Sequence, residues 1–204
     1  LYRLADKLPR PLPVVAAGGA DPTVLEAMSL AQRRGWIDPV LTGAVGGMRS
    51  LADDLDIDLS EFRLIEADDP ANAAVSEIKA GRARMLMKGQ IATPALMKAV
   101  LSRDTGLRTG RCICQIVLME IPRDNRRFLL ADTGITVEPT LDQKMDILRS
   151  MVDVAVELRD GTEGGPPRIG VMSATEKPNE AMPDTQDAVE LARRNSAGEI
   201  AGCI

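Results

Sequence analysis

The 204-residue sequence contains no histidine and very few aromatic residues. Without histidine, a Ser–His or Cys–His catalytic pair is excluded. The aromatic side chains are Tyr2, Trp36, Phe62 and Phe128, too few for the stacking platforms that bind single-stranded nucleic acid. Aliphatic side chains must therefore fill the core, and no nucleic acid is expected as a partner.

Cysteines and long apolar runs are also scarce. The three cysteines, Cys112, Cys114 and Cys203, form an odd set that suits a reducing compartment, so we expect a cytoplasmic protein. Cys112 and Cys114 are too close for the usual zinc spacing, and we expect them in the core and no metal site. No apolar run approaches the length that crosses a bilayer, and we expect no membrane association.

Charge excludes one further class of partner. The net charge is −5, and the basic residues are dispersed along the chain. A footprint for a nucleic-acid backbone would need them massed on one segment. Local groups of basic residues can still bind one small anion.

Strands and helices alternate in the first half. Apolar runs predict strands at 14–17, 40–42 and 63–66 and a buried strand at 84–87. Asp21-Pro22 and Asp69-Pro70 predict helix starts, because aspartate caps the first N–H groups and proline fits the first turn. Gly35 and Gly81 are placed to end these helices. This alternation predicts an α/β fold with a mostly parallel, doubly wound sheet.

The pattern changes after Cys114, and we expect a first α/β domain at 1–112 and a second α/β subdomain at 113–204. Runs at 115–121 and 127–131, joined by a short linker, predict an antiparallel hairpin. Thr140 is expected to cap a long helix whose apolar face is Leu141, Met145, Leu148, Val152 and Ala155. A loop at 160–167, strands at 168–172 and 200–204, and a helix beginning at Asp184 or Thr185 complete the prediction.

Four segments carry residues suited to binding an anion. In 87–94 a strand ends in Lys88-Gly89, and Thr93-Pro94 opens a helix, so backbone N–H groups and a helix dipole are expected beside a lysine. Segment 104–111 brings Arg108 and Arg111, whose guanidinium groups match phosphate oxygens. Each pattern also fits an ordinary turn with solvated charges, and spacing alone favours that interpretation for Lys88.

The other two segments are acidic or rich in hydroxyl groups. Asp132 is expected at a strand end, followed by a glycine turn. Ser173 and Lys177 follow the predicted strand at 168–172, with ingredients for a small-anion pocket. A capped loop before the last helix explains them nearly as well.

Taken in order, these segments resemble the phosphate acetyl/butyryl transferase family. The run ARMLMKGQIATPALMKAVLSRDTGLRTGR resembles the family's Met-Lys-Gly strand end, threonine-capped helix and Thr-Gly-Leu-Arg-Thr-Gly loop. FLLADTGITVEPTLDQKMDILRSMVDVA and VMSATEKPNEAMPDTQDA resemble its later strand, long helix and Ser-x-x-x-Lys segment. The resemblance covers nearly the whole chain and is weakest before Val14.

The resemblance implies a two-domain α/β fold shared with isocitrate and isopropylmalate dehydrogenases. It also implies reversible transfer of an acetyl, butyryl or similar short acyl group between coenzyme A and phosphate. The implied partners are coenzyme A as a substrate, acyl phosphate and inorganic phosphate, with no permanently bound cofactor and a homodimer. The implied phosphate- or substrate-binding residues are Lys88, Gly89, Thr93, Arg108, Arg111, Ser173 and Lys177. The implied catalytic residues are Asp132 and Arg111, with Asp132 a poor thiol base.

Some positions depart from the family pattern. Ala92 and Cys114-Gln115 replace polar residues, and Asp132-Thr133-Gly134 replaces Asp-Ala-Ala. The family continues to a C-terminal Ser-Arg motif and an acidic residue, and we expect these beyond the present sequence. We also expect residues 1–204 alone to be aggregation-prone and inactive, because the expected last strand would leave an exposed apolar edge.

Two alternatives remain open. The altered polar positions would also suit a non-catalytic relative that binds coenzyme A or an anion. A metal- and NAD-dependent dehydrogenase on the same architecture would need clustered aspartates and a dinucleotide motif, and residues 43–47 miss the G-x-G-x-x-G spacing.

Overall fold

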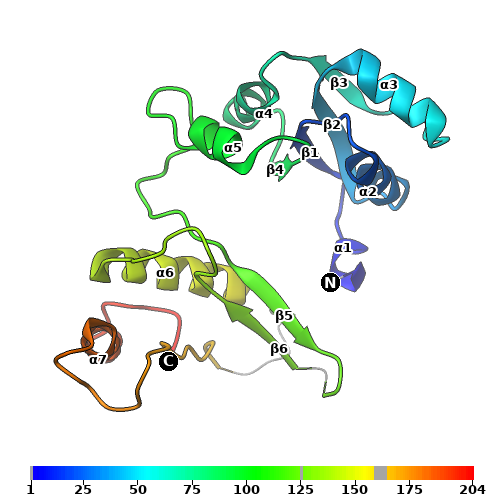
Figure 1. The fold of residues 1–204 in the computed structure, drawn as a ribbon. Helices are drawn as coiled ribbons and strands as arrows, with labels where there is room; N and C mark the ends of the chain where they lie inside the picture. The colour runs from blue at the N-terminus through cyan, green and yellow to red at the C-terminus, as the bar shows by residue number, and fades with distance from the viewer. Residues whose placement is uncertain (1, 125, 159–164) are drawn as a thin grey trace. The chain divides into compact units, whose positions relative to one another are not determined.

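The structure is a computed structural model that describes residues 2–124, 126–158 and 165–204 (Figure 1). The chain divides into two compact units, Leu1–Thr109 and Gly110–Ile204. This division lies close to the boundary expected between residues 112 and 113.

The first unit is an alternating α/β unit. Its elements are α1 (Tyr2–Ala5), β1 (Leu12–Ala17), α2 (Pro22–Arg33), β2 (Ile37–Gly43), α3 (Val45–Asp54), β3 (Arg63–Glu66), α4 (Pro70–Lys79), β4 (Met85–Lys88) and α5 (Thr93–Val100). The strands form one parallel sheet in the order β3-β2-β1-β4. Because the chain turns to the other side of β1 after β3, the sheet is doubly wound, as expected.

Local signals place the helices of this unit. The carboxylate of Asp21 accepts a hydrogen bond from the Val24 N–H at 3.1 Å at the start of α2. The carboxylate of Asp69 accepts one from the Asn72 N–H at 3.0 Å at the start of α4. Both helices begin with proline, as the sequence predicts. The sequence does not predict α3, where Gly46 and Gly47 are poor helix formers.

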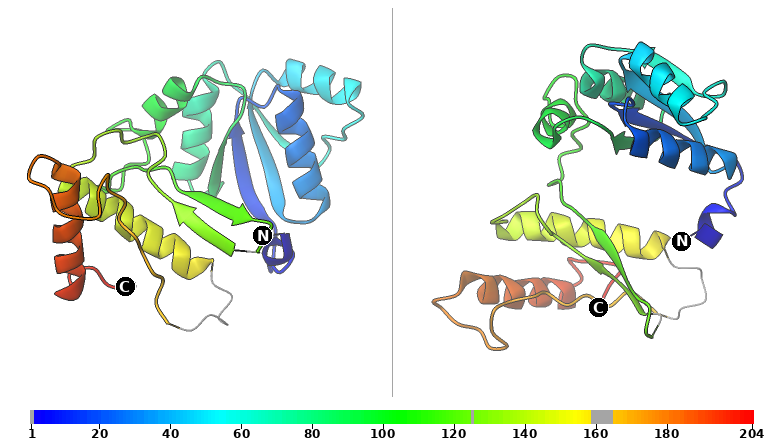
Figure 2. Two further views of the ribbon diagram at one scale, coloured as in Figure 1. Left: turned by 60° about the horizontal axis from the view of Figure 1, so that its bottom comes forward. Right: turned by 45° about the vertical axis from the view of Figure 1, so that its right-hand side comes forward.

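Two apolar clusters cover the two faces of the sheet. On one face, side chains of α2 and α3 pack against β1 and β2, with Leu25 and Met48 fully buried. On the opposite face, side chains of α4 and α5 pack against the same strands, with Ala74 fully buried. Figures 1 and 2 show these helix pairs on opposite sides of the sheet. The sheet is therefore the middle layer of three.

The expected burial of the fourth strand is wrong. β4 forms one edge of the sheet and pairs only with β1 in the described part of the chain. Its end residues, Met85 and Lys88, are exposed, and Leu86 and Met87 are partly buried. An apolar run predicts a strand, but its burial depends on neighbours that lie far away in the sequence.

The second unit joins a hairpin to two helices. β5 (Val117–Ile121) and β6 (Arg126–Leu130) pair antiparallel, which confirms the predicted hairpin. α6 (Leu141–Glu157) begins with the expected cap, where Thr140 and Gln143 form a reciprocal capping box. The cluster between α6 and α7 (Pro183–Ser196) contains Met145, Leu148, Val152, Leu191 and Ile200. The buried face predicted for α6 is thus largely confirmed.

The last two predicted strands are wrong. Segment 168–172 is irregular, and segment 200–204 forms no strand. The Ile169 N–H donates to the Ile204 carbonyl and the Ile204 N–H donates to the Pro167 carbonyl, at 2.9 and 3.0 Å. Val171, Met172 and Ile204 are exposed, so each run lacks a longer partner strand. α7 begins at Pro183, one or two residues earlier than predicted, and most of the loop predicted at 160–167 lies outside the described residues.

Candidate functional site

The carboxyl ends of β1 and β4 lie side by side at the point where the strand order reverses, between the β1-β2-β3 side of the sheet and β4. β1 lies between β2 and β4, and the register pairs Ala17 with Lys88 at the strand ends. Parallel α/β sheets bind ligands at such a point, outside the carboxyl ends of the strands. We call segment 18–21, which follows β1, the first rim loop, and segment 89–92, which follows β4, the second rim loop. They place Lys88, Gly89 and Thr93 at the expected edge of the sheet.

Glycines allow the two rim loops to touch through their backbones. The Gly89 N–H donates to the Ala17 carbonyl at 2.9 Å, and the Gln90 N–H donates to the Gly18 carbonyl at 2.8 Å. A Cβ atom on Gly89 would lie 2.1 Å from the Gly18 carbonyl oxygen. Only glycine fits there, which gives Gly89 a structural role beside its predicted binding role.

The backbone N–H groups of the second rim loop are less available than the sequence predicts. The N–H groups of Gly89, Gln90 and Ile91 already donate to backbone carbonyls, those of Ala17 at the end of β1, Gly18 and Gly89. Lys88 is exposed, and its Nζ lies 3.4 Å from the Gly89 carbonyl oxygen. The positive charge offered to an anion is therefore the Lys88 ammonium, together with the N-terminal end of α5.

Thr93 is not the cap of α5. The N-cap is Ala92, which makes no side-chain hydrogen bond to the helix, and Thr93 is the first helical residue. The resemblance to a threonine-capped helix is therefore wrong on this detail, because the helix starts one residue earlier. Thr93 is exposed at the rim.

Arg108 lies near the other end of α5. The N–H of its neighbour Leu107 donates to the Val100 carbonyl at 2.8 Å, and Leu107 packs against the cluster that contains α5. About 12 Å of helix, from the rise per residue, separates this end from Thr93. Arg108 is exposed. Thus the first unit groups Lys88, Gly89 and Thr93, and places the Arg108 backbone apart from them.

In the second unit, Arg111 forms an exposed ion pair. Its Nη1 lies 2.7 Å from Oδ2 of Asp153 on α6. This hydrogen bond and the charge of Asp153 raise the pKa of Arg111 above its ordinary value. The next N–H, of Cys112, donates to Asp146 of the same helix at 3.0 Å. Segment 111–112 is therefore fixed along α6.

Asp132 follows β6 and holds a tight turn. Its Oδ1 accepts hydrogen bonds from the N–H groups of Gly134 at 2.9 Å and Ile135 at 3.0 Å, and its Oδ2 accepts one from Thr136 at 3.0 Å. Burial raises the pKa of Asp132, but the backbone hydrogen bonds outweigh burial and lower it below its ordinary value. A carboxylate held in this way is a weak base, which agrees with the expectation that Asp132 is a poor thiol base.

Cys112 and Cys114 are partly buried free thiols close to the Asp132 turn. Burial raises the pKa of the Cys114 thiol first, and the negative charge of Asp132 raises it further. A thiol with a raised pKa stays protonated near neutral pH and is a poor nucleophile.

Ser173 and Lys177 lie in an exposed loop before α7. The Ser173 hydroxyl donates to the Thr175 carbonyl, and the Thr175 hydroxyl donates to the Lys177 carbonyl, both at 2.8 Å. The expectation that both residues stand at a strand end is wrong, because no strand forms there. Their own loop holds them in place.

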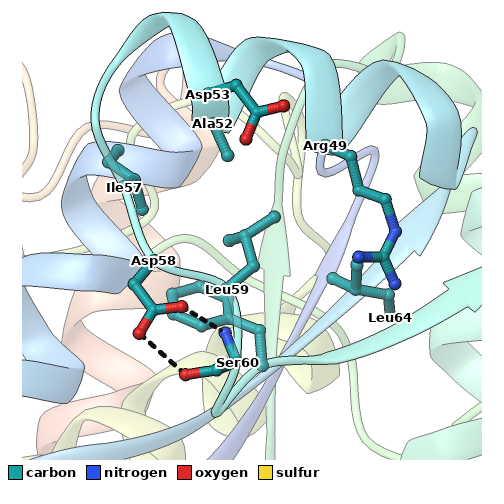
Figure 3. Close-up of a pocket in the computed structure, with 9 residues that line it drawn as sticks. Arg49, Ala52, Asp53, Ile57, Asp58, Leu59, Ser60 and Leu64 are labelled. Carbon is teal, nitrogen blue, oxygen red and sulfur yellow. Dashed lines mark hydrogen bonds between the residues drawn. The ribbon is translucent and has the colours of Figure 1, made fainter.

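The described residues contain a hollow elsewhere, at the amino end of β3 (Figure 3). It has a volume of about 570 Å³ and is lined by Arg49, Ala52, Asp53, Ile57, Asp58, Leu59, Ser60, Phe62 and Leu64. None of the sequence-predicted site residues lines it. Its charged groups are the carboxylates of Asp53 and Asp58 and the guanidinium group of Arg49. The N–H and the hydroxyl of Ser60 both donate to Asp58. A phosphate dianion would therefore be repelled from this hollow.

Neither a metal-binding group nor a membrane-spanning helix occurs among the described residues. No group of three or more histidine, cysteine, aspartate or glutamate residues among them could hold a metal ion. None of their helices has the length and apolar character needed to cross a membrane.

The sequence prediction missed Gly18, whose carbonyl oxygen binds the second rim loop. A signal was present, because a Gly-Gly pair directly follows a predicted strand at 14–17. Such glycines often mark a close approach of two backbones. Which backbone approaches is not readable from local sequence.

Known proteins match this chain in sequence and in fold. A family model described as Phosphate acetyl/butaryl transferase matches residues 65–203. The phosphate acetyltransferase of Thermotoga maritima is 34% identical over 94% of this chain, and the phosphate butyryltransferase of Clostridium acetobutylicum is 31% identical over 94%. A branched-chain phosphotransacylase from Enterococcus faecalis V583 superposes with a TM-score of 0.76 at 23% identity, over 94% of this chain.

These proteins are longer than the chain. The match covers 64% of the T. maritima protein, 63% of the C. acetobutylicum protein and 66% of the E. faecalis structure. A phosphotransacetylase from Streptococcus pyogenes has the same TM-score of 0.76 at 16% identity, with 70% of its chain covered. The family model spans more than half of the sequence and includes Lys88, Arg108, Arg111 and Asp132. The chain therefore belongs to the phosphate acetyl/butyryl transferase family.

Proposed function

We propose that the protein is a phosphate acyltransferase that transfers a short acyl group, such as acetyl or butyryl, between coenzyme A and phosphate. The observation that carries the proposal is the Lys88-Gly89 strand end beside the start of α5, at the reversal point of a sheet whose chain belongs to this family. An ammonium group and a helix N-terminus together favour an anion such as an acyl phosphate.

The reaction needs charge neutralisation and orientation. The thiol sulfur of coenzyme A attacks the acyl carbon, a carbon–sulfur bond forms, the carbon–oxygen bond to phosphate breaks, and the thiol proton is released. Fixed cations stabilise the charge that moves onto the leaving phosphate. We assign this task to Lys88, Arg108 and Arg111, with Gly89, Thr93, Ser173 and Lys177 as further binding residues.

We assign Asp132 as the residue that accepts the thiol proton. Its lowered pKa predicts an inefficient base, so we expect Asp132→Asn to reduce kcat less than Arg111→Ala does. The family resemblance also leads us to propose a cytoplasmic homodimer. Light scattering of the purified protein would measure its mass in solution.

The assay uses the full-length gene product, acetyl phosphate or butyryl phosphate, and coenzyme A, and it follows thioester formation. We expect Lys88→Ala and Arg108→Ala each to raise KM for acyl phosphate by roughly 5- to 150-fold, because charge-assisted hydrogen bonds contribute about 1–3 kcal/mol. Lys98→Ala and Arg103→Ala remove nearby exposed cations outside the proposed site and are the matched controls. Their KM should stay within about twofold, the range of a neutral surface change.

Two outcomes would count against the proposal. An unchanged KM in the Lys88 and Arg108 variants would remove these residues from the phosphate site. Absence of thioester formation by the wild-type protein would contradict the enzyme assignment. Calorimetry with coenzyme A and inorganic phosphate would then test the non-catalytic alternative, a relative that binds these molecules without reaction.

A further inference from the structure

The contact between the two rim loops leaves no room for a side chain at Gly18. This residue has φ of +87°, and a Cβ atom on it would lie 2.8 Å from Cγ2 of Ile91 and 2.9 Å from the carbonyl carbon and oxygen of Gln90. Two of these three contacts are with backbone atoms, which cannot rotate away as a flexible side chain can. Any other residue at position 18 must separate the rim loops.

The first rim loop cannot yield, because it is fixed from the other side. The N–H groups of Gly18 and Gly19 both donate to the Thr42 carbonyl, at 3.1 and 3.0 Å. Thr42 is fully buried in β2, and its hydroxyl donates to the Pro70 carbonyl at 2.8 Å. A Cβ atom on Gly19 would lie 2.8 Å from Cβ of Leu41. The core therefore lies directly behind this loop.

The second rim loop is the part free to shift, and it connects the proposed binding residues. Lys88 directly precedes the loop, and Thr93 directly follows it. Ile91 is partly buried against the cluster that contains Leu96 and Ala99 of α5. A displacement of residues 90 and 91 would therefore move the start of α5 relative to the Lys88 ammonium.

We propose that Gly18 is a positioning residue for the phosphate site: its missing side chain sets the distance between the end of β4 and the start of α5. This inference rests on the proposed phosphate acyltransferase function. Gly18 does not bind the substrate itself. It acts through the second rim loop, so its substitution should affect acyl phosphate binding through Lys88 and Thr93.

The test compares Gly18→Ala with Gly81→Ala in the full-length protein. Gly81 has a similar positive φ of +71°, but a Cβ atom there would have no neighbour within 4 Å. Both variants therefore carry a comparable backbone strain, and only Gly18→Ala adds a collision. We expect Gly18→Ala to raise KM for acyl phosphate at least about tenfold, the loss of one good contact, and Gly81→Ala to leave it within about twofold.

A double-mutant cycle separates positioning from general destabilisation. If Gly18 acts through the Lys88 region, Gly18→Ala should raise KM much less in a Lys88→Ala background than in the wild type. Fully additive effects would overturn the proposal. Adding Ile91→Ala to Gly18→Ala removes one of the colliding groups and should recover part of the KM. A double variant whose KM stays as high as that of Gly18→Ala would also count against the proposal.

Two further measurements keep the test decisive. If Gly18→Ala does not fold, Ile91→Ala alone loosens the same contact, and an unchanged KM in that variant would overturn the proposal. If the wild-type protein forms no thioester, the proposed function fails, and hydrogen exchange of the amides at 89–92 still tests the contact. Faster exchange in Gly18→Ala than in Gly81→Ala would support the structural part, and equal exchange would overturn it.

Discussion

The two units of the chain are held together in different ways. In the first unit, strands with fully buried side chains such as Val15 and Leu41 lie between two layers of helices. In the described part of the second unit, the apolar side chain with the least exposure is Leu191, and it belongs to a small cluster between two helices. The first unit fixes its rim through backbone contacts, whereas the second fixes Arg111 and Lys144 through ion pairs.

This difference predicts how each unit tolerates change. Backbone contacts between rim loops depend on geometry and not on charge, so they should be insensitive to salt. Exposed ion pairs such as Arg111–Asp153 contribute little and weaken as salt increases. The first unit should therefore be the more stable and the more easily damaged by changes in side-chain volume.

The largest expected effect is that of Leu25→Ala in the core of the first unit. Leu25 is fully buried on α2, so its truncation should lower the free energy of unfolding of this unit by about 2–5 kcal/mol. Leu30→Ala on the same helix removes a side chain that is 48% exposed and should cost less than about 0.5 kcal/mol. Hydrogen exchange of β1 and α6 amides measures each unit separately. Equal loss of protection in α6 would show that the two units unfold together.

A smaller effect is expected from Glu77→Gln, which removes the negative charge of a buried side chain. Glu77 on α4 is 6% exposed and accepts hydrogen bonds from Arg82 and Arg63. The hydrogen bonds of Arg82 come first among the causes that lower the pKa of Glu77 to about 2. The ionised Glu77 carboxylate therefore contributes its full share to the free energy of unfolding above the ordinary pKa of 4.5. This contribution is lost as the pH falls toward 2.

Glu77→Gln should lower the free energy of unfolding near neutral pH by about 1–3 kcal/mol and flatten its decline between pH 4.5 and 2. Chemical denaturation at several pH values would measure both effects. Glu26→Gln changes an exposed carboxylate on α2 and is the control, with an expected change below about 0.5 kcal/mol. If the free energy of unfolding of Glu77→Gln fell just as steeply with pH, the Glu77 carboxylate would not be the cause of the decline.

The smallest effect is expected from Thr140→Ala in the second unit. The Thr140 hydroxyl accepts a hydrogen bond from the Gln143 N–H at 3.3 Å, and the Gln143 side chain accepts one from the Thr140 N–H at 2.9 Å. Losing this cap should cost about 1 kcal/mol. Thr133→Ala, at an exposed turn, is the control. Urea denaturation followed at α6 would measure the change in the free energy of unfolding. A decrease as large as that of Leu25→Ala would contradict the expected order of the effects in the two units.

The sequence predicts best what depends on neighbouring residues. Asp21-Pro22, Asp69-Pro70 and Thr140 each predict a helix start, and each is confirmed, because a capping side chain and the N–H group that donates to it lie within one turn. α3 is missed because Gly46 and Gly47 argue against a helix that the burial of Met48 nevertheless stabilises. Burial of β4 and pairing at 168–172 are wrong, because both depend on strands far away in the sequence.

The same limit applies to the candidate site. Lys88 could be placed at a strand end because an apolar run precedes it and a helix follows. The position of Thr93 as the first helical residue and the ion pair of Arg111 with Asp153 could not be predicted, because each depends on exact local geometry or a distant helix. Gly18 remained hidden because its constraint is a contact with Gln90 and Ile91, which belong to another strand–helix connection.

The absence of space at Gly89 also limits how this protein can evolve. Every substitution of glycine adds a Cβ atom, and here that atom would meet the Gly18 carbonyl oxygen at 2.1 Å. Substitution of either glycine alone would therefore require a change in the backbone of the two rim loops. Substitutions should instead accumulate at exposed residues of the second rim loop that have no assigned binding role, such as Gln90 and Ala92. The two glycines would be inherited together while their neighbours vary.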